Sequence, residues 1–199
     1  MGYSEQTAAA LHRLYDAAEE CRECVLHKEA ISLVRPCAAP SEVMLVGRNP
    51  GREESVVGEP YAGPTGDYIR EWLSICGLKW EDVFMTHLVK CFTDANREPE
   101  PACVQKCSRL FFNNEVELVS PTAILMMGDY VCRRLTGRQI RVAGPFTYTR
   151  HKFFSQLVGH DCYVFYCYSP GVCIRGSIEW EDRCRAGFVD VAVGLKKVL

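Results

Sequence analysis

The sequence predicts an α/β domain built on a doubly wound, parallel sheet of about four strands flanked by helices. Two observations carry this prediction. Short apolar runs rich in branched residues recur along the chain, and segments with apolar residues near a period of 3.6 lie between them. Buried parallel strands and their crossover helices alternate in this way. The expected strands are residues 43–46, 83–89, 123–127 and 163–168.

The expected helices fill the intervals between these strands. After an amphipathic N-terminal helix, apolar stripes predict helices over 66–76, 101–119 and 129–135. A last helix carries apolar residues from Cys184 to Val198. Segments rich in Pro and Gly follow the strands at 47–66, 92–101 and 168–176. Binding sites of open parallel sheets form at the carboxyl ends of the strands, so we expect the site among these segments.

The composition predicts one soluble domain that spans residues 1–199. Its 48% hydrophobic and 24% charged residues are ordinary for a globular protein. No stretch approaches ~18 consecutive apolar residues, and the N-terminal segment carries acidic residues, which secretory signals lack. We therefore expect a cytoplasmic monomer without a membrane partner. The formal net charge of −2 provides no overall basic field, so any binding of DNA must use a local basic surface.

Twelve cysteines are the most unusual feature of the composition. In a chain without a secretory signal they argue against a disulfide scaffold and for metal binding. Cys21 and Cys24 form a C-x2-C pair, and fifteen residues separate Cys91 from Cys107. If the loop between the second pair closes onto the first pair, four thiolates meet. The spacing alone is compatible with an iron–sulfur cluster, with zinc or with core cysteines, and the other eight cysteines are expected to be buried or loop thiols.

An ordered series of motifs accompanies these cysteines. In chain order the series is CREC at 21–24, GRNPG at 47–51, GEPYAGPTG at 58–66, THLVKC at 86–91, ANREP at 95–99, Cys107 and YSPGVCIR at 168–175. It is similar to the series of the family-4 iron–sulfur uracil-DNA glycosylases over residues 21–199. The resemblance implies a uracil-DNA glycosylase-like domain with a pocket for a base flipped out of DNA. It also implies a structural [4Fe–4S] cluster held by Cys21, Cys24, Cys91 and Cys107.

The GRNPG turn supplies the centre of the expected pocket. A glycosylase breaks the bond between the sugar and an extruded base, so it needs a tight turn near the sugar. Gly47 and Gly51 allow a close approach of the backbone, and Pro50 stiffens the turn. Family 4 usually reads G-E-A-P-G, with an acidic residue one position earlier, whereas Arg48 and Asn49 resemble the G-x-N-P-G turn of the mismatch-specific and single-strand-selective branches. That likeness implies that Asn49 positions the attacking water, while Arg48 either contacts a phosphate or is solvated.

Tyr61 and Gly63 belong to the next motif. Tyr61 matches the family's aromatic position, where a ring stacks on the flipped base, and such stacking is worth ~1–3 kcal/mol. The alternative is an ordinary core tyrosine. Gly63 leads into a helix whose N-terminal N–H groups are suited to a phosphate.

Two positions depart from the family pattern where the base is read. His87 stands where family 4 has an Asn that reads uracil, and an imidazole offers a different set of donors and acceptors. A donor there would suit the acceptors of a cytosine-type base. Ser169 stands where the family has a His that donates to the base, and losing one such donor costs on the order of 10²–10³ in rate. We therefore expect catalytic roles for Asn49, His87 and Ser169 but weak activity toward uracil.

The segment after Ser169 is expected to contact DNA. Pro170 and Gly171 begin it, an apolar tip at residues 172–174 can wedge into the base stack, and Arg175 meets a phosphate. The alternative is an ordinary surface turn.

The leading hypothesis is a monofunctional DNA N-glycosylase, a hydrolase that removes a modified pyrimidine. Hydroxymethylated and glucosylated cytosines of phage DNA are candidates, which would make the enzyme part of antiviral defence. One alternative is a uracil-DNA glycosylase in base-excision repair. Two others are a catalytically inactive DNA-binding homologue and a base-modifying enzyme of phage DNA metabolism. No lysine is placed to form a Schiff base, so lyase activity is not expected.

Overall fold

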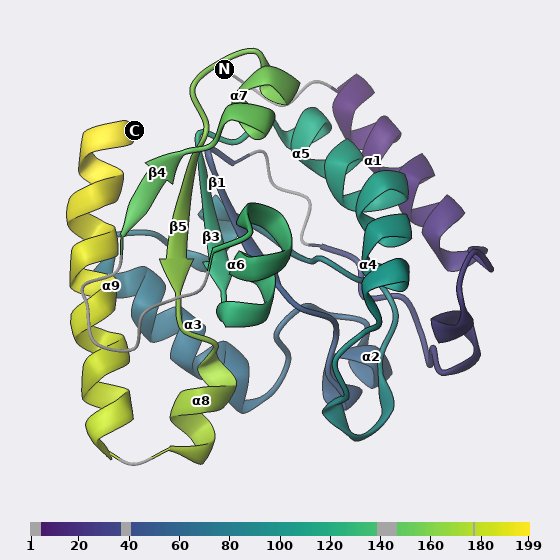
Figure 1. Ribbon diagram of the computed structural model, residues 1–199, viewed down its shortest axis with the longest axis horizontal. Helices are drawn as coiled ribbons and strands as arrows, with labels where there is room; N and C mark the ends of the chain where they lie inside the picture. Colours follow the sequence, from purple (N-terminus) through teal and green to yellow (C-terminus); the bar gives the residue numbers. More distant parts are fainter. Residues whose placement is uncertain (1–4, 37–40, 139–146, 177) are drawn as a thin grey trace.

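The structure, a computed structural model, describes residues 5–36, 41–138, 147–176 and 178–199 (Figure 1). Its strands are β1 (Val43–Gly47), β2 (Val83–His87), β3 (Ala123–Met127), β4 (Tyr148–Arg150) and β5 (Tyr163–Cys167). Its α-helices are α1 (Glu5–Glu19), α2 (Arg52–Val57), α3 (Pro64–Ile75), α4 (Pro101–Cys107), α5 (Asn113–Val119), α6 (Asp129–Thr136), α7 (Lys152–Val158), α8 (Pro170–Arg175) and α9 (Ile178–Val198). A π-helical turn (Ser108–Phe112) joins α4 to α5, and 3-10 turns cover Val25–Lys28, Trp80–Asp82 and Asp94–Asn96.

Within these described residues, five strands form one sheet in the order β2-β1-β3-β5-β4. The first four in this order run parallel, which confirms the predicted doubly wound α/β class and its four parallel strands. The short edge strand β4 is antiparallel to β5 and was not predicted. Its three residues are too few and too exposed to form an apolar run. Tyr148 instead stacks on Phe165 of β5 with ring centroids 4.9 Å apart, which holds the edge in place.

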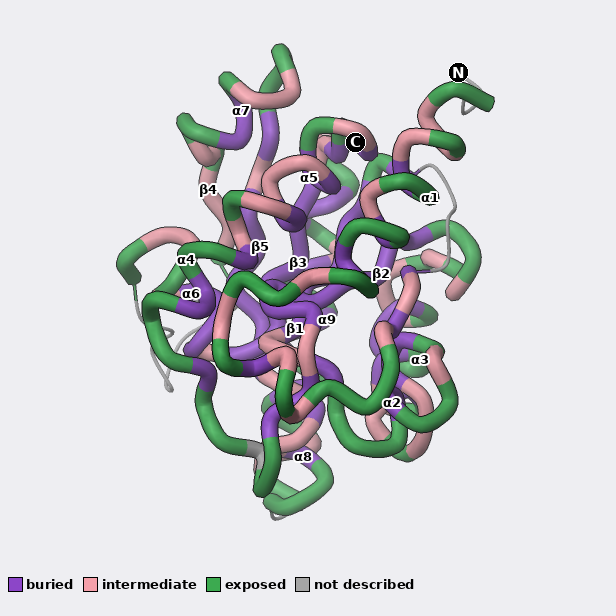
Figure 2. The backbone as a smooth tube through the Cα atoms, turned by 90° about the vertical axis from the view of Figure 1, so that its right-hand side faces the viewer, coloured by how far each residue is buried: buried purple, intermediate pink, exposed green. Residues whose placement is uncertain are grey.

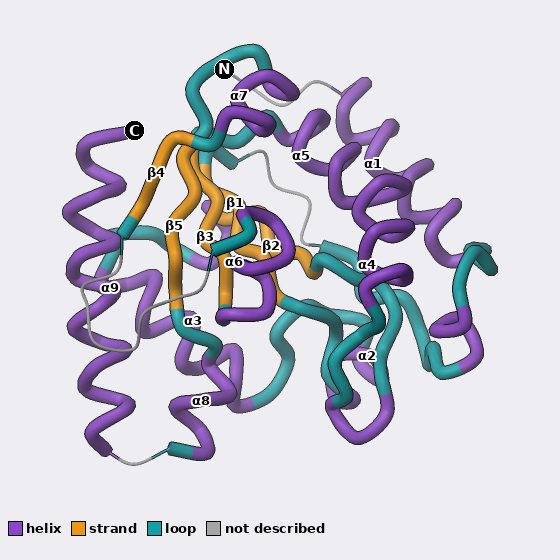
Figure 3. Tube along the Cα trace, viewed as in Figure 1, coloured by secondary structure: helices purple, strands orange, loops and turns teal. Residues whose placement is uncertain are grey.

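Helices cover both faces of the sheet, as the tube views show (Figures 2 and 3). One apolar core lies between the sheet and helices α1, α4, α5, α6 and α7. The other lies between the sheet and helices α3, α8 and α9. Alternate residues of β1 divide between them, because Met44 and Val46 face the first core while Val43 and Leu45 face the second. Every residue of β1 is therefore buried, as in parallel sheets covered on both sides.

Strand β2 ends earlier than predicted, at His87. The residues that follow still pair with the turn after β1, because the Leu88 N–H donates to the Gly47 carbonyl at 2.8 Å and the Val89 N–H donates to the Arg48 carbonyl at 3.0 Å. The side chain of His87 is thus fixed beside the GRNPG turn.

Two expected loop or helix boundaries change in the structure. The segment predicted as one helix over 101–119 is continuous but contains the π-helical turn in its middle. The segment at 168–176, expected to be a loop, contains the short helix α8, which begins at a proline as helices often do. None of the described helices is long and apolar enough to cross a lipid bilayer.

Candidate active site

A pocket of about 680 Å³ opens at the carboxyl edge of the sheet. Strand β1 lies between β2 and β3, and the chain passes from β1 to β2 and then crosses back to β3 on the other side. The pocket lies at this switch point, where doubly wound sheets bind ligands. Eleven of the twelve residues predicted for catalysis and DNA binding line it. They are Gly47, Arg48, Asn49, Pro50, Gly51, Tyr61, His87, Ser169, Pro170, Gly171 and Arg175.

Gly63 is the predicted residue that does not line the pocket. Its backbone has a φ of +84°, and a Cβ there would lie 2.1 Å from a carboxylate oxygen of Glu53. A glycine is therefore required for the chain to turn into α3. Nothing in the geometry assigns it to a phosphate.

Gly47 allows two side chains to approach the backbone at the pocket floor. A Cβ on Gly47 would lie 2.6 Å from the hydroxyl oxygen of Tyr61 and 2.8 Å from Cδ2 of His87. Any larger residue would push these rings away. The predicted role of this glycine in close packing thus has a specific cause, namely the two aromatic rings behind the turn.

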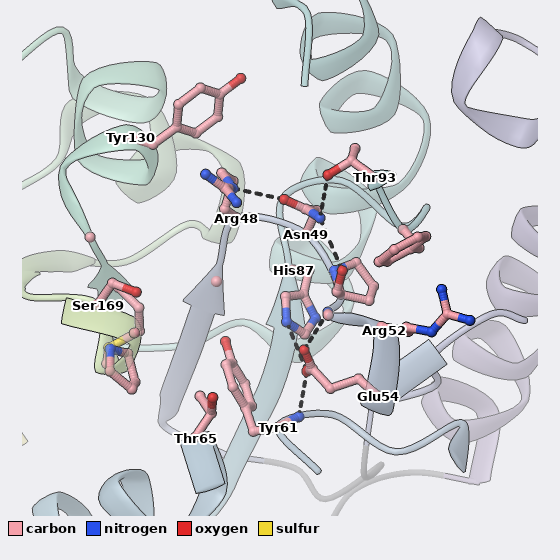
Figure 4. A pocket seen from close by; sticks show the side chains of 18 of the residues that line it. Arg48, Asn49, Arg52, Glu54, Tyr61, Thr65, His87, Thr93, Tyr130 and Ser169 are labelled. Carbon is pink, nitrogen blue, oxygen red and sulfur yellow. Dashed lines mark hydrogen bonds and ion pairs between the residues drawn. The ribbon is translucent and has the colours of Figure 1, made fainter. Parts of the chain in front are cut away.

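The rings of Tyr61 and His87 stack on each other with centroids 4.8 Å apart (Figure 4). The Tyr61 hydroxyl donates to the Thr86 carbonyl at 3.1 Å, and its side chain is almost completely buried. One face of the Tyr61 ring is therefore occupied by His87. Tyr61 has a positive φ of 55°, which is unusual for a residue with a side chain, and this backbone conformation places its ring under the pocket.

Glu54 of α2 is the important pocket residue that the motifs did not single out. Oε1 of its carboxylate lies 3.2 Å from Nε2 of His87 and accepts the Tyr61 N–H at 2.5 Å. Oε2 accepts the Gly51 N–H at 2.6 Å. Burial alone would raise the pKa of Glu54, but His87 and the two backbone N–H groups outweigh it and lower the pKa below its ordinary value of 4.5.

Asn49 points across the pocket toward Thr93 (Figure 4). Its Nδ2 donates to Thr93 Oγ1 at 3.1 Å and to the Pro50 carbonyl at 3.0 Å, and its Oδ1 accepts from Nε of Arg48 at 2.8 Å. The amide is thus held in one orientation from both ends. The Arg48 guanidinium also lies over the ring of Tyr130, 5.9 Å from its centroid, and burial lowers the pKa of Arg48.

Ser169 and helix α8 form the opposite wall of the pocket. The expected apolar tip at residues 172–174 does not form as predicted. Cys173 is only 4% exposed and packs in the core with α9, because α8 turns that side chain inward. Ile174 is the exposed member, at 43%, while Val172 lines the pocket.

Four predicted ligand cysteines and one further cysteine gather beside the end of β2. Burial first, and then the surrounding thiols, raise the pKa of the Cys91 thiol to about 12. The surrounding thiols are those of Cys107, Cys24, Cys21 and Cys103. Thus the structure brings the C-x2-C pair next to the later pair, and also brings Cys103 close. In the described part of the chain, no three His, Cys, Asp or Glu side chains converge on a single metal-ion position.

One of these thiols receives a hydrogen bond from the backbone. The Lys90 N–H donates to Sγ of Cys107 at 3.3 Å, and sulfurs bound to iron commonly receive such bonds. Cys103 lies in α4 and its thiol is within hydrogen-bonding reach of Cys24. Of the eight cysteines expected to be ordinary thiols, Cys37 lies outside the described residues.

Comparison with known proteins identifies the family. The model of the Uracil DNA glycosylase superfamily matches residues 35–178. The chain belongs to that superfamily. A Type-4 uracil-DNA glycosylase from Pyrobaculum aerophilum is 33% identical over 172 residues, which are 83% of this chain and 85% of that protein.

Two further relatives carry the same description. A Type-4 uracil-DNA glycosylase from Saccharolobus solfataricus is 29% identical over 172 residues, 82% of this chain and 77% of that protein. One from Archaeoglobus fulgidus is 35% identical, but the match spans 114 residues and 57% of each chain. Membership of the uracil-DNA glycosylase superfamily confirms the resemblance drawn from the motifs. It places the chain in an enzyme family of DNA N-glycosylases.

Because the pKa of Glu54 is lowered in the folded protein, we predict that its contribution to stability depends on pH. A carboxylate whose pKa is lower in the folded state stabilises the fold fully above its ordinary pKa, and loses that contribution as the pH falls through the folded value. We expect Glu54→Gln to lower the melting temperature at pH 7. The difference in melting temperature between the wild type and Glu54→Gln should decrease steadily below about pH 4.5. Thermal unfolding at a series of pH values measures this difference.

The control is Glu53→Gln, which changes the exposed neighbour of Glu54 in the same helix. This control should leave the melting temperature close to that of the wild type throughout. A gap between wild type and Glu54→Gln that stays constant down to about pH 3 would contradict the assigned interaction.

Proposed function

We propose that this protein is a DNA glycosylase that hydrolytically removes a modified pyrimidine from a nucleotide flipped into the pocket. The observation that carries the proposal is the contact between His87 and the buried carboxylate of Glu54, at the position where the motif resemblance implies that the base is read. Removal of hydroxymethylated or glucosylated cytosine from phage DNA would be antiviral defence. We propose that the enzyme acts as a monomer in the cytoplasm.

The Glu54 contact limits what His87 can offer to a base. Nε2 lies 3.2 Å from the Glu54 carboxylate, which can only accept, and we infer from this contact that Nε2 carries a proton. Within the described residues, Nδ1 of His87 has no hydrogen-bond partner. A neutral ring presents one acceptor there, and a protonated ring presents one donor. Neither matches the donor and acceptor that an Asn amide presents together to uracil, whereas the donor form suits N3 or O2 of a cytosine-type base.

The size of the pocket supports a bulky base. A volume of about 680 Å³ falls in the range that accommodates drug-sized ligands, and an unsubstituted pyrimidine needs less. The wall formed by α6 and α8 carries the small residues Gly128, Ser169 and Gly171. Ser169 in place of a larger histidine leaves space on this side for a substituent of the ring.

The arrangement of polar groups supports hydrolysis. In the transition state the sugar becomes positive and the departing base becomes negative. Asn49 Oδ1 accepts from Arg48 and retains a second lone pair that can hold the attacking water. His87 and Ser169 line the same pocket, and we assign them to the side of the base, where a donor would stabilise the leaving anion. Arg48 and Arg175 line the same pocket and offer charge to the flanking phosphates.

We propose that Cys21, Cys24, Cys91 and Cys107 hold a [4Fe–4S] cluster. The cluster would tie the end of α1 to the segment after β2 and to α4, and would supply no step of the hydrolysis. Support comes from the gathering of these thiols and from the Lys90 N–H directed at Cys107.

The decisive experiment offers the purified protein matched oligonucleotides that contain uracil, cytosine, hydroxymethylcytosine or glucosylated hydroxymethylcytosine. Abasic sites are scored by alkaline cleavage, and the released base is identified by mass. We expect excision of one of the modified cytosines and little excision of uracil. Excision of uracil alone would overturn the modified-base proposal and favour a repair enzyme. DNA binding without any abasic product would indicate an inactive homologue.

A double variant sharpens the same assay. His87→Asn with Ser169→His installs the residues of the family pattern, and we expect uracil excision to rise on the order of 10²-fold while excision of the modified base falls. His160→Asn makes a similar chemical change at an exposed histidine outside the pocket and should alter neither rate. An unchanged ratio of the two rates in the double variant would contradict the proposed reading roles.

The cluster proposal predicts the iron content of cysteine variants. Protein purified without oxygen should contain about four irons and four acid-labile sulfides per chain, and Cys91→Ser or Cys107→Ser should lose them. Cys103→Ser, beside Cys24 but outside the proposed ligand set, and Cys162→Ser, in the core, should keep them. Zinc in place of iron, or retention of iron by Cys107→Ser, would contradict the assignment.

A further inference from the structure

A second hollow, of about 510 Å³, lies between α4 with the π-helical turn, α6 and α7. We call it the α4–α6–α7 groove. Its polar side chains are those of Gln105, Ser108, Arg109, Asn113 and Arg134. No acidic residue lines it within the described part of the chain. A chain with 25 acidic residues and a net charge of −2 thus presents a groove whose only charges are positive, which favours an anionic ligand.

The two arginines of the groove are available to such a ligand. Arg109 and Arg134 are both exposed, and neither forms an ion pair with any described residue. Arg109 and Ser108 lie in the π-helical turn, a distortion that often marks functional sites.

An exposed aromatic ring lies beside these charges. Phe153 of α7 lines the groove and is 49% exposed. Its ring meets that of Phe154 edge-on, with centroids 5.4 Å apart and an interplanar angle of 61°. In this edge-on arrangement, part of the Phe153 ring remains exposed to solvent. Positive charges next to an accessible aromatic ring are the features with which proteins bind single-stranded nucleic acid.

The groove adjoins the active-site pocket. Tyr130 lines the pocket, and the Arg134 guanidinium lies 5.0 Å from the centroid of its ring. The Tyr130 hydroxyl donates to the carbonyl of Pro99 at 2.5 Å, two residues before Pro101 of the groove. Tyr130 of the pocket thus contacts Arg134 of the groove and holds the segment that leads to Pro101.

We propose that the α4–α6–α7 groove binds the single-stranded DNA that flanks the extruded nucleotide. Arg109 and Arg134 contact phosphates, and Phe153 stacks on a base. This assignment rests on the proposed function only in taking DNA as the ligand. It does not depend on which base the pocket removes.

The test measures binding of a fluorescent single-stranded oligonucleotide that contains only unmodified bases, over a range of salt concentrations. The double variant Arg109→Ala/Arg134→Ala should bind at least tenfold more weakly at low salt. It should also reduce the slope of log affinity against log salt by about 1.4, at about 0.7 per phosphate contact. Phe153→Ala should weaken binding about tenfold without a change of slope.

The matched control is Arg183→Ala/Arg185→Ala, which removes the same charge from α9 on the other face of the sheet. If this control weakens DNA binding as much as the groove variants do, the effect is general electrostatics and the proposed groove assignment is wrong. If the groove variants bind DNA as tightly as the wild type, the assignment is also wrong. Equal losses on duplex DNA would contradict the single-strand assignment. Competition by polyglutamate as strong as by DNA would assign the groove to an acidic protein. If this binding result holds while no base is excised, the proposed function fails and the groove stands.

Discussion

A buried ion pair between Lys90 and Glu115 holds the end of β2 in place, and the site is built around that strand end. The Lys90 ammonium lies 2.6 Å from the Glu115 carboxylate and donates to Thr86 Oγ1 and to the His87 carbonyl, each at 2.7 Å. Tyr15 of α1 and Thr86 both donate to Glu115. Both charges are nearly inaccessible to water, so removing either partner would leave the other as an unpaired charge in the core.

The same lysine stands between the pocket and the cysteines. Its side chain bonds to the carbonyl of His87, its N–H bonds to Cys107, and Cys91 is the next residue. A displacement of the thiols would therefore be transmitted to His87 through a single residue. The proposed cluster would therefore support the pocket mechanically, by fixing the position of the strand end. The pocket then forms because β1, β2, β3 and β5 all end at this edge.

The sequence was sufficient for the features whose cause is local. Four apolar runs predicted the four parallel strands, and the motifs identified eleven residues that line one pocket. Features whose cause is tertiary were missed. The edge strand β4 is held by the stacking of Tyr148 on Phe165, and Cys173 of α8 is buried in a core that it shares with α9. Glu54 gave a weak signal, an acid three residues after Gly51 at a helix start, but its partner His87 is distant in the chain.

We propose that Glu54 fixes the ring of His87 so that Nδ1 is the atom offered to the base. Nitrogen NMR of protein labelled at histidine tests this most directly, with the His87 signals assigned by their loss in His87→Asn. We predict that Nε2 of His87 carries a proton near pH 7 and that its signal changes in Glu54→Gln. A neutral ring with its only proton on Nδ1 would leave Nε2 without a proton to donate to Glu54, and would contradict this role of Glu54.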